Sequence, residues 1–169
     1  VYKRQAMFVC SNRNIAYDFY KIVKELRPEW TEKKICDDGV VLSEKDKKEL
    51  KPMEKIKLVM TRNKDDEKDL FDMLGTKEDR KEFDRQFKNP KSNFKIAIVV
   101  DMWLTGFDVP ELDTIYIDKP IQQHTLIQTI SRVNRVCEGK DKGLIVDYIG
   151  IKKNMNTCLL YTSPSPRDS

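Results

Sequence analysis

The segments KIAIVVD (residues 95–101) and TIYID (114–118) are short, apolar and rich in β-branched side chains. Runs of this kind are typical of strands that are buried on both faces of a parallel sheet. They are followed by HTLIQTISRVNRV (124–136), whose apolar residues recur at helical spacing, and by a last apolar run, GLIVDY (143–148). Strands that alternate with helices in this way predict an α/β fold, with a mainly parallel sheet covered by helices on both faces.

The beginning of the chain repeats the alternation. AMFVC (6–10) predicts a buried strand, and Ser11 follows it as a residue suited to cap a helix. The next segment predicts a helix that stops at Pro28 and buries four apolar residues at helical spacing: Ile15, Phe19, Val23 and Leu26.

The middle of the chain contains one more strand and two helices. IKLVMT (56–61) is the strand, and residues 65–74 form a short helix that Gly75 ends. Thr76 can cap a second helix, which must stop before Pro90. Each predicted strand is thus separated from the next by helical or loop sequence, as a parallel sheet requires.

Three segments do not fit the alternation. Residues 29–55 are rich in lysine and acidic side chains, and we expect a variable surface insertion there with one helical turn near 44–50. Residues 1–5 and 157–169 resemble translated sequencing-adapter sequence, so we expect both ends to be non-native and place the domain at 6–156. The chain is therefore expected to be a fragment of a longer gene product.

Composition limits the class of protein. The chain has 169 residues, 36% of them charged, and no apolar run approaches the roughly 18 residues of a membrane span. Its four cysteines and single histidine show no spacing typical of a zinc site or a disulfide framework. We expect a cytoplasmic protein with reduced thiols, no metal site and no membrane contact. A net charge of +4 is compatible with nucleic-acid binding.

The segment LTGFDVP (104–110) follows the strand 95–101, at the edge where α/β sheets bind ligands. Gly106 allows backbone N–H groups to approach a phosphate, and Asp108 could accept hydrogen bonds from a sugar hydroxyl. The alternative is an ordinary turn glycine followed by a capping aspartate.

The helix QTISRVNR carries two arginines three residues apart, Arg132 and Arg135, with Gln128 one turn before Arg132. Two guanidinium groups on one side of a helix can bind a polyphosphate. The alternative is a solvated basic face. The position of this helix after a strand, in a chain that also has the 104–110 loop, favours the phosphate-binding hypothesis.

Two short polar segments follow the first two strands: Ser11-Asn12-Arg13 and Thr61-Arg62-Asn63-Lys64. Their hydroxyl and N–H groups could hold nucleic-acid phosphates, although helix capping and ordinary loop chemistry also explain them. No Gly-x-x-x-x-Gly-Lys-Ser/Thr sequence occurs in the chain. An arginine helix without such a phosphate-binding loop is half of a nucleotide site.

Two long stretches, 99–120 (VVDMWLTGFDVPELDTIYIDKP) and 126–150 (LIQTISRVNRVCEGKDKGLIVDYIG), closely resemble the second RecA-like domain of type I restriction endonuclease motor subunits, which are superfamily 2 helicases. TGFD (105–108) matches motif V, QTISRVNR (128–135) matches motif VI, and AMFVCSNR (6–13) resembles motif IV. The resemblance covers most of the chain and implies a RecA-like fold.

The resemblance also implies roles for the residues of motif VI. Arg135 would be the arginine finger, with Arg132 beside it and Gln128 positioning the pair. Motif VI usually has glycine before its first arginine, and this chain has Ser131 there.

In the same family pattern, motif V would couple nucleotide to DNA. Gly106 and Asp108 would take part in nucleotide binding together with the arginine pair. The DNA-binding residues would be Ser11, Asn12, Thr61, Arg62 and Thr105.

For the whole protein, the resemblance implies an ATP-dependent type I site-specific deoxyribonuclease that translocates double-stranded DNA. ATP with Mg²⁺ would be bound mainly by an absent first motor domain, so the fragment alone should be inactive. The expected partners are DNA and the methyltransferase and specificity subunits. Two alternatives remain: a non-catalytic nucleic-acid-binding RecA-like domain, or half of another superfamily 2 helicase.

Overall fold

The computed structural model describes residues 5–106, 108–134, 140 and 142–150. Within these ranges the chain forms five strands: β1 (Gln5–Cys10), β2 (Ile56–Val59), β3 (Ile96–Val99), β4 (Leu112–Asp118) and β5 (Leu144–Asp147). The helices are α1 (Arg13–Leu26), the 3-10 helix η1 (Pro28–Thr31), α2 (Glu44–Glu49), α3 (Lys68–Leu74), α4 (Lys77–Lys88) and α5 (Gln123–Val133).

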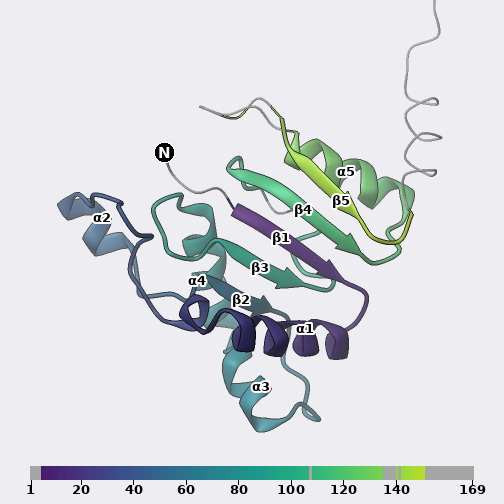
Figure 1. Ribbon diagram of the computed structural model, residues 1–169, viewed down its shortest axis with the longest axis horizontal. Helices are drawn as coiled ribbons and strands as arrows, with labels where there is room; N and C mark the ends of the chain where they lie inside the picture. The colour runs from purple at the N-terminus through teal and green to yellow at the C-terminus, as the bar shows by residue number, and fades with distance from the viewer. Residues whose placement is uncertain (1–4, 107, 135–139, 141, 151–169) are drawn as a thin grey trace, which may run out of the picture.

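The strands form one parallel sheet in the order β2-β3-β1-β4-β5, with β1 at its centre (Figure 1). Ala6 of β1 pairs with Ile96 of β3 on one side and with Thr114 of β4 on the other. All five strands that the sequence predicted are present, and the α/β class with a mainly parallel sheet is confirmed. Because the strands run in the same direction, the loops at their carboxyl ends gather along one edge.

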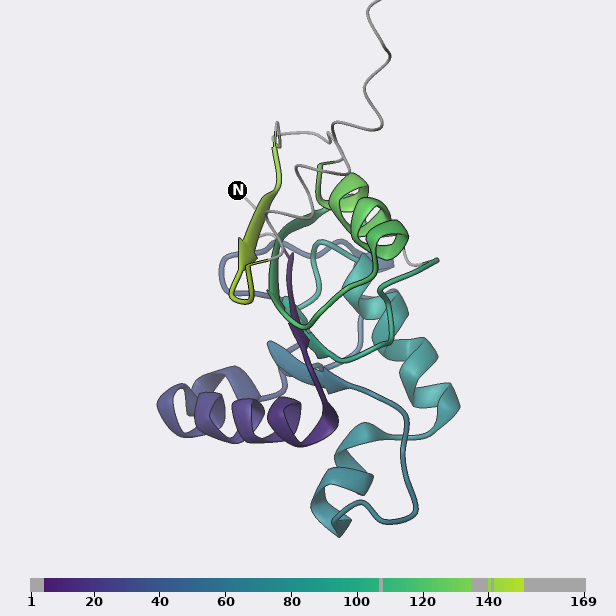
Figure 2. The ribbon, with the colours of Figure 1, turned by 90° about the vertical axis from the view of Figure 1, so that its right-hand side faces the viewer.

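Successive residues of each strand point to opposite faces, and each face is packed by its own helices. α4 and α5 cover one face, where Phe87 and Leu126 pack in the same cluster as Met7 and Val9 of β1 (Figure 2). The other face buries Cys10 of β1 against side chains of α1 and α3: Ala16, Tyr20, Leu70 and Leu74.

Helix α1 differs from its prediction in two respects. Its N-cap is Asn12, one residue later than Ser11, and the Asn12 side chain accepts a hydrogen bond from the N–H of Ile15 at 2.9 Å. The buried residues of the helix are Ala16 and Tyr20, and Phe19 and Val23 are partly buried and pack against the same cluster. Ile15 is 42% exposed and Leu26 72% exposed, which corrects two of the four residues of the predicted apolar face.

The other boundaries agree to within a few residues. α4 begins where Thr76 was predicted to cap it, and the Thr76 side chain accepts from the N–H of Asp79 at 3.2 Å. α3 begins at Lys68, later than the predicted residue 65, and β4 begins at Leu112, two residues before the predicted 114.

The 29–55 segment contains α2, near the predicted helical turn at 44–50. It also contributes to the body of the domain, because Leu50 and Met53 are buried and Lys34 forms a backbone bridge with Met53. Gln5, which the predicted boundary leaves outside the domain, is the buried first residue of β1. Residues 157–169 lie outside the described part of the chain.

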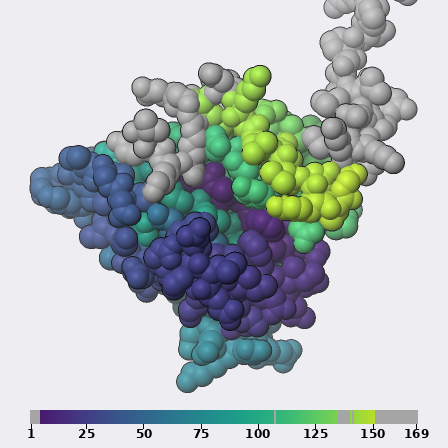
Figure 3. Space-filling view, in the orientation of Figure 1, coloured from purple at the N-terminus to yellow at the C-terminus, as the bar shows by residue number. Residues whose placement is uncertain are grey.

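On the α1 side, β1, β4 and the residue after β5 carry a row of stacked aromatic rings. The Phe8 ring centroid lies 5.4 Å from that of Tyr116 and 6.0 Å from that of Tyr148, which is 58% exposed. Figure 3 shows this face, with α1 in dark purple and β5 in yellow at the surface. No helix in the described ranges is long and apolar enough to cross a membrane.

Candidate functional site

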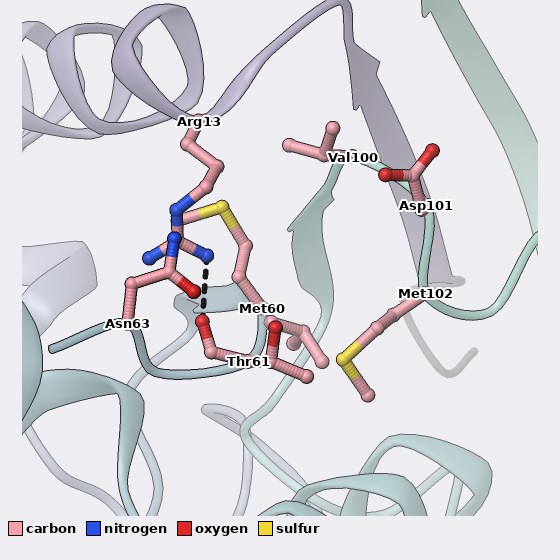
Figure 4. A pocket seen from close by; sticks show the side chains of 8 residues that line it. Arg13, Met60, Thr61, Asn63, Val100, Asp101 and Met102 are labelled. Carbon is pink, nitrogen blue, oxygen red and sulfur yellow. Dashed lines mark hydrogen bonds between the residues drawn. The ribbon is translucent and has the colours of Figure 1, made fainter.

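The carboxyl ends of β1, β2 and β3 surround a small cavity of about 110 Å³. Arg13 enters it from the start of α1, Thr61 and Asn63 from the loop after β2, and Asp101 and Met102 from the loop after β3 (Figure 4). The two polar segments that the sequence singled out, after the first and second strands, are therefore brought together.

Arg13 joins these two segments directly. Its guanidinium donates to the carbonyl oxygen of Thr61 at 2.6 Å and to both carboxylate oxygens of Asp66 at 2.6 and 2.7 Å. Asp66 also accepts from the backbone N–H of Asn63 at 2.7 Å. A planar guanidinium suits this forked contact, and the result is a β2–α3 loop whose conformation depends on α1.

The residues predicted to bind DNA have different surroundings. Asn12 uses its side-chain oxygen to cap α1. Arg62 turns toward α3, where its Nε donates to the carbonyl of Phe71 at 2.7 Å and its guanidinium carbon lies 4.2 Å from the Phe71 ring centroid. Thr61 lines the cavity with Arg13, whereas Ser11 and Arg62 do not.

The loop between β3 and β4, residues 100–111, contains the TGFD segment and has an unusual backbone. Gly106 has a φ of +68°, and a Cβ added there would meet no atom within 4 Å, so the backbone conformation is what favours glycine. Trp103 has a φ of +66°, the one positive value among the described non-glycine residues. Thr105 and Asp108 are exposed at the surface of this loop.

Three basic side chains donate to backbone carbonyls of this loop and of its junction with β4. Lys119, after β4, contacts the Val100 carbonyl at 3.1 Å and also pairs with the Asp101 carboxylate. Arg132 of α5 donates from one nitrogen to two successive carbonyls, those of Trp103 at 3.2 Å and Leu104 at 2.7 Å.

The third basic side chain comes from the segment before β5. Lys140 is buried and donates to the carbonyls of Pro110 at 3.4 Å and Leu112 at 2.5 Å. The loop is thus held at its beginning, middle and end by cations from three separate elements.

Helix α5 carries the predicted phosphate-binding residues. Gln128 is exposed, and Arg132 is half-buried with its guanidinium directed at the loop. Burial lowers the pKa of Arg132 below its usual value, while the negative charge of Asp108 acts in the opposite direction. The hydroxyl of Ser131 donates to the carbonyl of Ile127 at 2.8 Å, within its own helix. Arg135 lies outside the described residues.

The described residues match only part of a nucleotide site. They include no group of three or more histidine, cysteine, aspartate or glutamate side chains placed to hold a metal ion. They do place two guanidinium groups, those of Arg13 and Arg132, at this edge of the sheet, where both donate to protein oxygen atoms.

Sequence reasoning missed several residues of this edge. Asp66 belongs to a run of charged residues that resembles any solvated loop. No sequence pattern identifies Lys119 or Lys140 as a hydrogen-bond donor to a backbone carbonyl. The Trp103 ring packs with its centroid 5.3 Å from that of Phe87. The backbone conformation of Trp103 has no signature in the sequence.

A family model described as type I restriction enzyme subunit R domain 3 (T1R_D3-like) matches residues 2–150 of the chain. The chain belongs to this family. The resemblance to type I restriction motor subunits, inferred from motifs IV, V and VI, is confirmed.

Curated relatives of this R-subunit domain are type I restriction endonuclease subunits. The chain is 39% identical to the HindI endonuclease subunit of Haemophilus influenzae over 89% of its own length and 13% of the relative's. It is 48% identical to the putative MjaIXP endonuclease subunit of Methanocaldococcus jannaschii over 68% of its length and 11% of that protein. The chain therefore spans a small fraction of the length of these relatives.

Solved structures similar to the R-subunit domain include helicases. The Pyrococcus furiosus Hef helicase domain aligns over 91% of this chain and 23% of its own, with a TM-score of 0.42 and 16% identity. Saccharomyces cerevisiae Dbp5 bound to RNA and ADP BeF3 aligns over 94% of this chain and 39% of its own, with a TM-score of 0.44 and 17% identity.

Proposed function

We propose that this domain is the second motor domain of an ATP-dependent double-stranded DNA translocase within a type I site-specific restriction endonuclease. The observation that carries the proposal is the direct contact between α5 and the TGFD loop. Arg132 of α5 donates to the carbonyls of Trp103 and Leu104, immediately before Thr105. A helix suited to phosphate and a loop suited to nucleic acid therefore adjoin at the carboxyl edge of one sheet.

On the nucleotide side, we assign the arginine finger to Arg135, with Gln128 positioning it from one face of α5. Gly106 and Asp108 would approach the nucleotide from the loop. ATP with Mg²⁺, held mainly by a first motor domain, would supply the free energy of phosphoryl transfer. Arg135 would present a guanidinium across the domain interface, where a fixed positive charge stabilises the charge that develops on the phosphoryl group.

On the DNA side, the domain would contact the sugar-phosphate backbone. The proposed contacts come from loops that end strands: Ser11, Asn12, Thr61, Arg62 and Thr105. The Asn12 side chain caps α1, and Arg62 packs on Phe71, so the backbone N–H groups and the hydroxyls are better placed than these two side chains. Such contacts carry no sequence preference, as a translocase requires.

In the whole enzyme the domain would act with its methyltransferase and specificity subunits on DNA in the cytoplasm. The family and its curated relatives support this assembly, although the chain spans only 13% of the HindI subunit. The domain alone would hydrolyse no ATP, because the chain contains no phosphate-binding loop of the Gly-x-x-x-x-Gly-Lys-Ser/Thr type.

The test uses Arg135→Ala in the full-length subunit that carries this domain. We expect ATP turnover to fall by about a hundredfold or more, since one charge contact in the transition state is worth roughly that factor. DNA affinity should change less than about twofold, because a nucleotide-facing arginine adds no phosphate contact to the DNA. Arg135→Lys should not restore turnover, because an ammonium group does not reproduce the guanidinium fork.

Arg27→Ala is the matched control, because Arg27 has an exposed side chain and only a 3.8 Å contact with Glu29. It should leave both turnover and DNA affinity unchanged. If Arg135→Ala retained hydrolysis but lost DNA binding, α5 would belong to the DNA groove. The domain would then be a nucleic-acid-binding module and the assignment of the arginine finger would be wrong.

A further inference from the structure

The loop from Val100 to Leu112 packs apolar side chains into the core and is also held through its backbone. Five of its carbonyls accept hydrogen bonds from Lys119, Arg132 and Lys140. Lys119 follows β4 and Lys140 precedes β5, so both are attached to the sheet. Arg132 belongs to α5 and is the one of the three that a helix carries. The loop is therefore fixed to the sheet at both ends and to α5 in the middle.

The turn that Arg132 contacts is also the most constrained part of the loop. Trp103 adopts a left-handed backbone conformation, which is uncommon for a bulky residue and persists where the surroundings enforce it. Its ring is fixed on one side, with centroids 5.3 Å from Phe87 and 6.3 Å from Phe94. Its carbonyl is fixed on the other side by Arg132. The turn formed by Trp103 and Leu104 leads directly into Thr105 and Gly106.

We propose that Arg132 is a positioning residue, which holds the Trp103–Leu104 turn so that a displacement of α5 is transmitted to the TGFD loop. The coupling part of this proposal rests on the proposed function, in which α5 faces the nucleotide and the loop faces DNA. The positioning part does not, because it concerns contacts within this chain.

Two observations favour this role over a direct nucleotide contact. One nitrogen of the Arg132 guanidinium already contacts two carbonyls, and the side chain is half-buried against the loop. Burial lowers the pKa of the group, and the charge of exposed Asp108 offsets part of that effect. A guanidinium in these surroundings donates hydrogen bonds to fixed carbonyl dipoles, and these bonds compensate for its lost hydration.

The positioning part is tested on the 169-residue chain itself by hydrogen–deuterium exchange with peptide resolution. Arg132→Ala should speed exchange in the peptide spanning 101–112 by roughly tenfold, as expected when a partly buried loop loses two hydrogen bonds from a charged donor. Peptides from β1 and β3 should keep their exchange rates, which separates a local effect from loss of the fold. Arg27→Ala should leave all peptides unchanged.

The coupling part is tested on the full-length subunit by steady-state ATPase measurements with and without DNA. Arg132→Ala should abolish most of the DNA stimulation of kcat, with the KM for ATP changed less than about twofold. Arg132→Lys should recover part of both the exchange protection and the DNA stimulation, since an ammonium group can still donate to the Leu104 carbonyl. A nucleotide-contacting arginine would show neither recovery nor a constant KM.

Unchanged exchange in the 101–112 peptide of Arg132→Ala would overturn the proposal whatever the enzyme does. Faster exchange with intact DNA stimulation would overturn the coupling. A parent subunit without DNA-stimulated ATPase would instead refute the proposed function, and the exchange result would still decide whether Arg132 positions the turn.

Discussion

Replacing Arg13 by alanine removes the contact between α1 and the loop after β2. The Arg13 side chain is 26% exposed and the Asp66 side chain 7% exposed, so the pair is mostly shielded from water. Three hydrogen bonds are lost: two to the Asp66 carboxylate and one to the Thr61 carbonyl. What remains is a shielded carboxylate that still accepts a hydrogen bond from the Asn63 N–H.

The expected cost lies between two known limits. Exposed ion pairs contribute about 0.2–1 kcal/mol, whereas breaking a fully buried pair costs about 3–5 kcal/mol. Arg13 is a quarter exposed, and Asp66 keeps the Asn63 N–H, so we expect a loss of about 2–3 kcal/mol in the free energy of unfolding. A double-mutant cycle with Asp66→Asn should give a coupling energy of about 1–2 kcal/mol.

The pH dependence has a definite sign. Burial raises the pKa of Asp66, but the Asn63 N–H and the Arg13 guanidinium outweigh it and hold the pKa below its usual 3.8. A carboxyl group whose pKa is lowered by folding stabilises the protein above its unfolded-state pKa and loses that contribution as the pH falls through its folded-state pKa. The cost of Arg13→Ala should therefore be full at pH 7 and smaller at pH 3.

The assay is urea denaturation of the 169-residue chain followed by circular dichroism, at pH 7 and pH 3. Lys21→Ala is the control, because Lys21 pairs with Asp18 at 2.9 Å while their side chains are 49% and 66% exposed. Its cost should stay below about 0.5 kcal/mol. A cost for Arg13→Ala no larger than that of the control, or one that grows at pH 3, would refute the reasoning.

Two further predictions concern single residues. Gly106→Ala and Gly39→Ala should each lower the free energy of unfolding, measured by urea denaturation, by about 1–2 kcal/mol. Both glycines have a positive φ and open space at Cβ. Only Gly106→Ala should lower the DNA-stimulated ATPase rate of the full-length subunit. Cys10 should react with iodoacetamide at pH 8 far more slowly than Cys36, as measured by mass spectrometry, because burial, followed by the charge of Asp118, raises the pKa of the Cys10 thiol to about 11. An equal fall in ATPase rate for the two glycine variants would contradict the first prediction, and equal alkylation rates for Cys10 and Cys36 would contradict the second.

Much of the fold could be predicted because the strands are apolar, β-branched and separated by helices. The runs 56–61 and 95–101 needed no tertiary information, and Thr76 with Asp79 forms a capping box that marks the start of α4. The predicted face of α1 was correct for Phe19 and Val23, which pack against the core, and wrong for Ile15 and Leu26. The cap lies at Asn12 and not at the predicted Ser11. Local sequence does not distinguish two adjacent residues that can both cap a helix.

The candidate site could be predicted in its location but not in its contacts. Gly106 and Arg132 could be assigned to one edge because the carboxyl ends of parallel strands meet there. The sequence does not predict that Arg132 donates to the carbonyls of Trp103 and Leu104. Every residue has a backbone carbonyl, so residue identity does not indicate which carbonyl accepts the hydrogen bond. The Arg13–Asp66 pair joins residues that are 53 positions apart, and a single sequence contains no signal of that proximity.

The central position of β1 has a consequence for how the protein is made. Of the five strands, β1 leaves the ribosome first. It has neighbours on both sides only after Ile96 and Thr114, the partners of Ala6, have been synthesised. During that interval Met7, Val9 and Cys10, all buried in the finished domain, are part of an unpaired apolar segment. Pairings this distant in sequence form slowly, and such segments aggregate readily. A nascent chain that stalls before β3 would therefore leave this central apolar strand unpaired and become a substrate for chaperones.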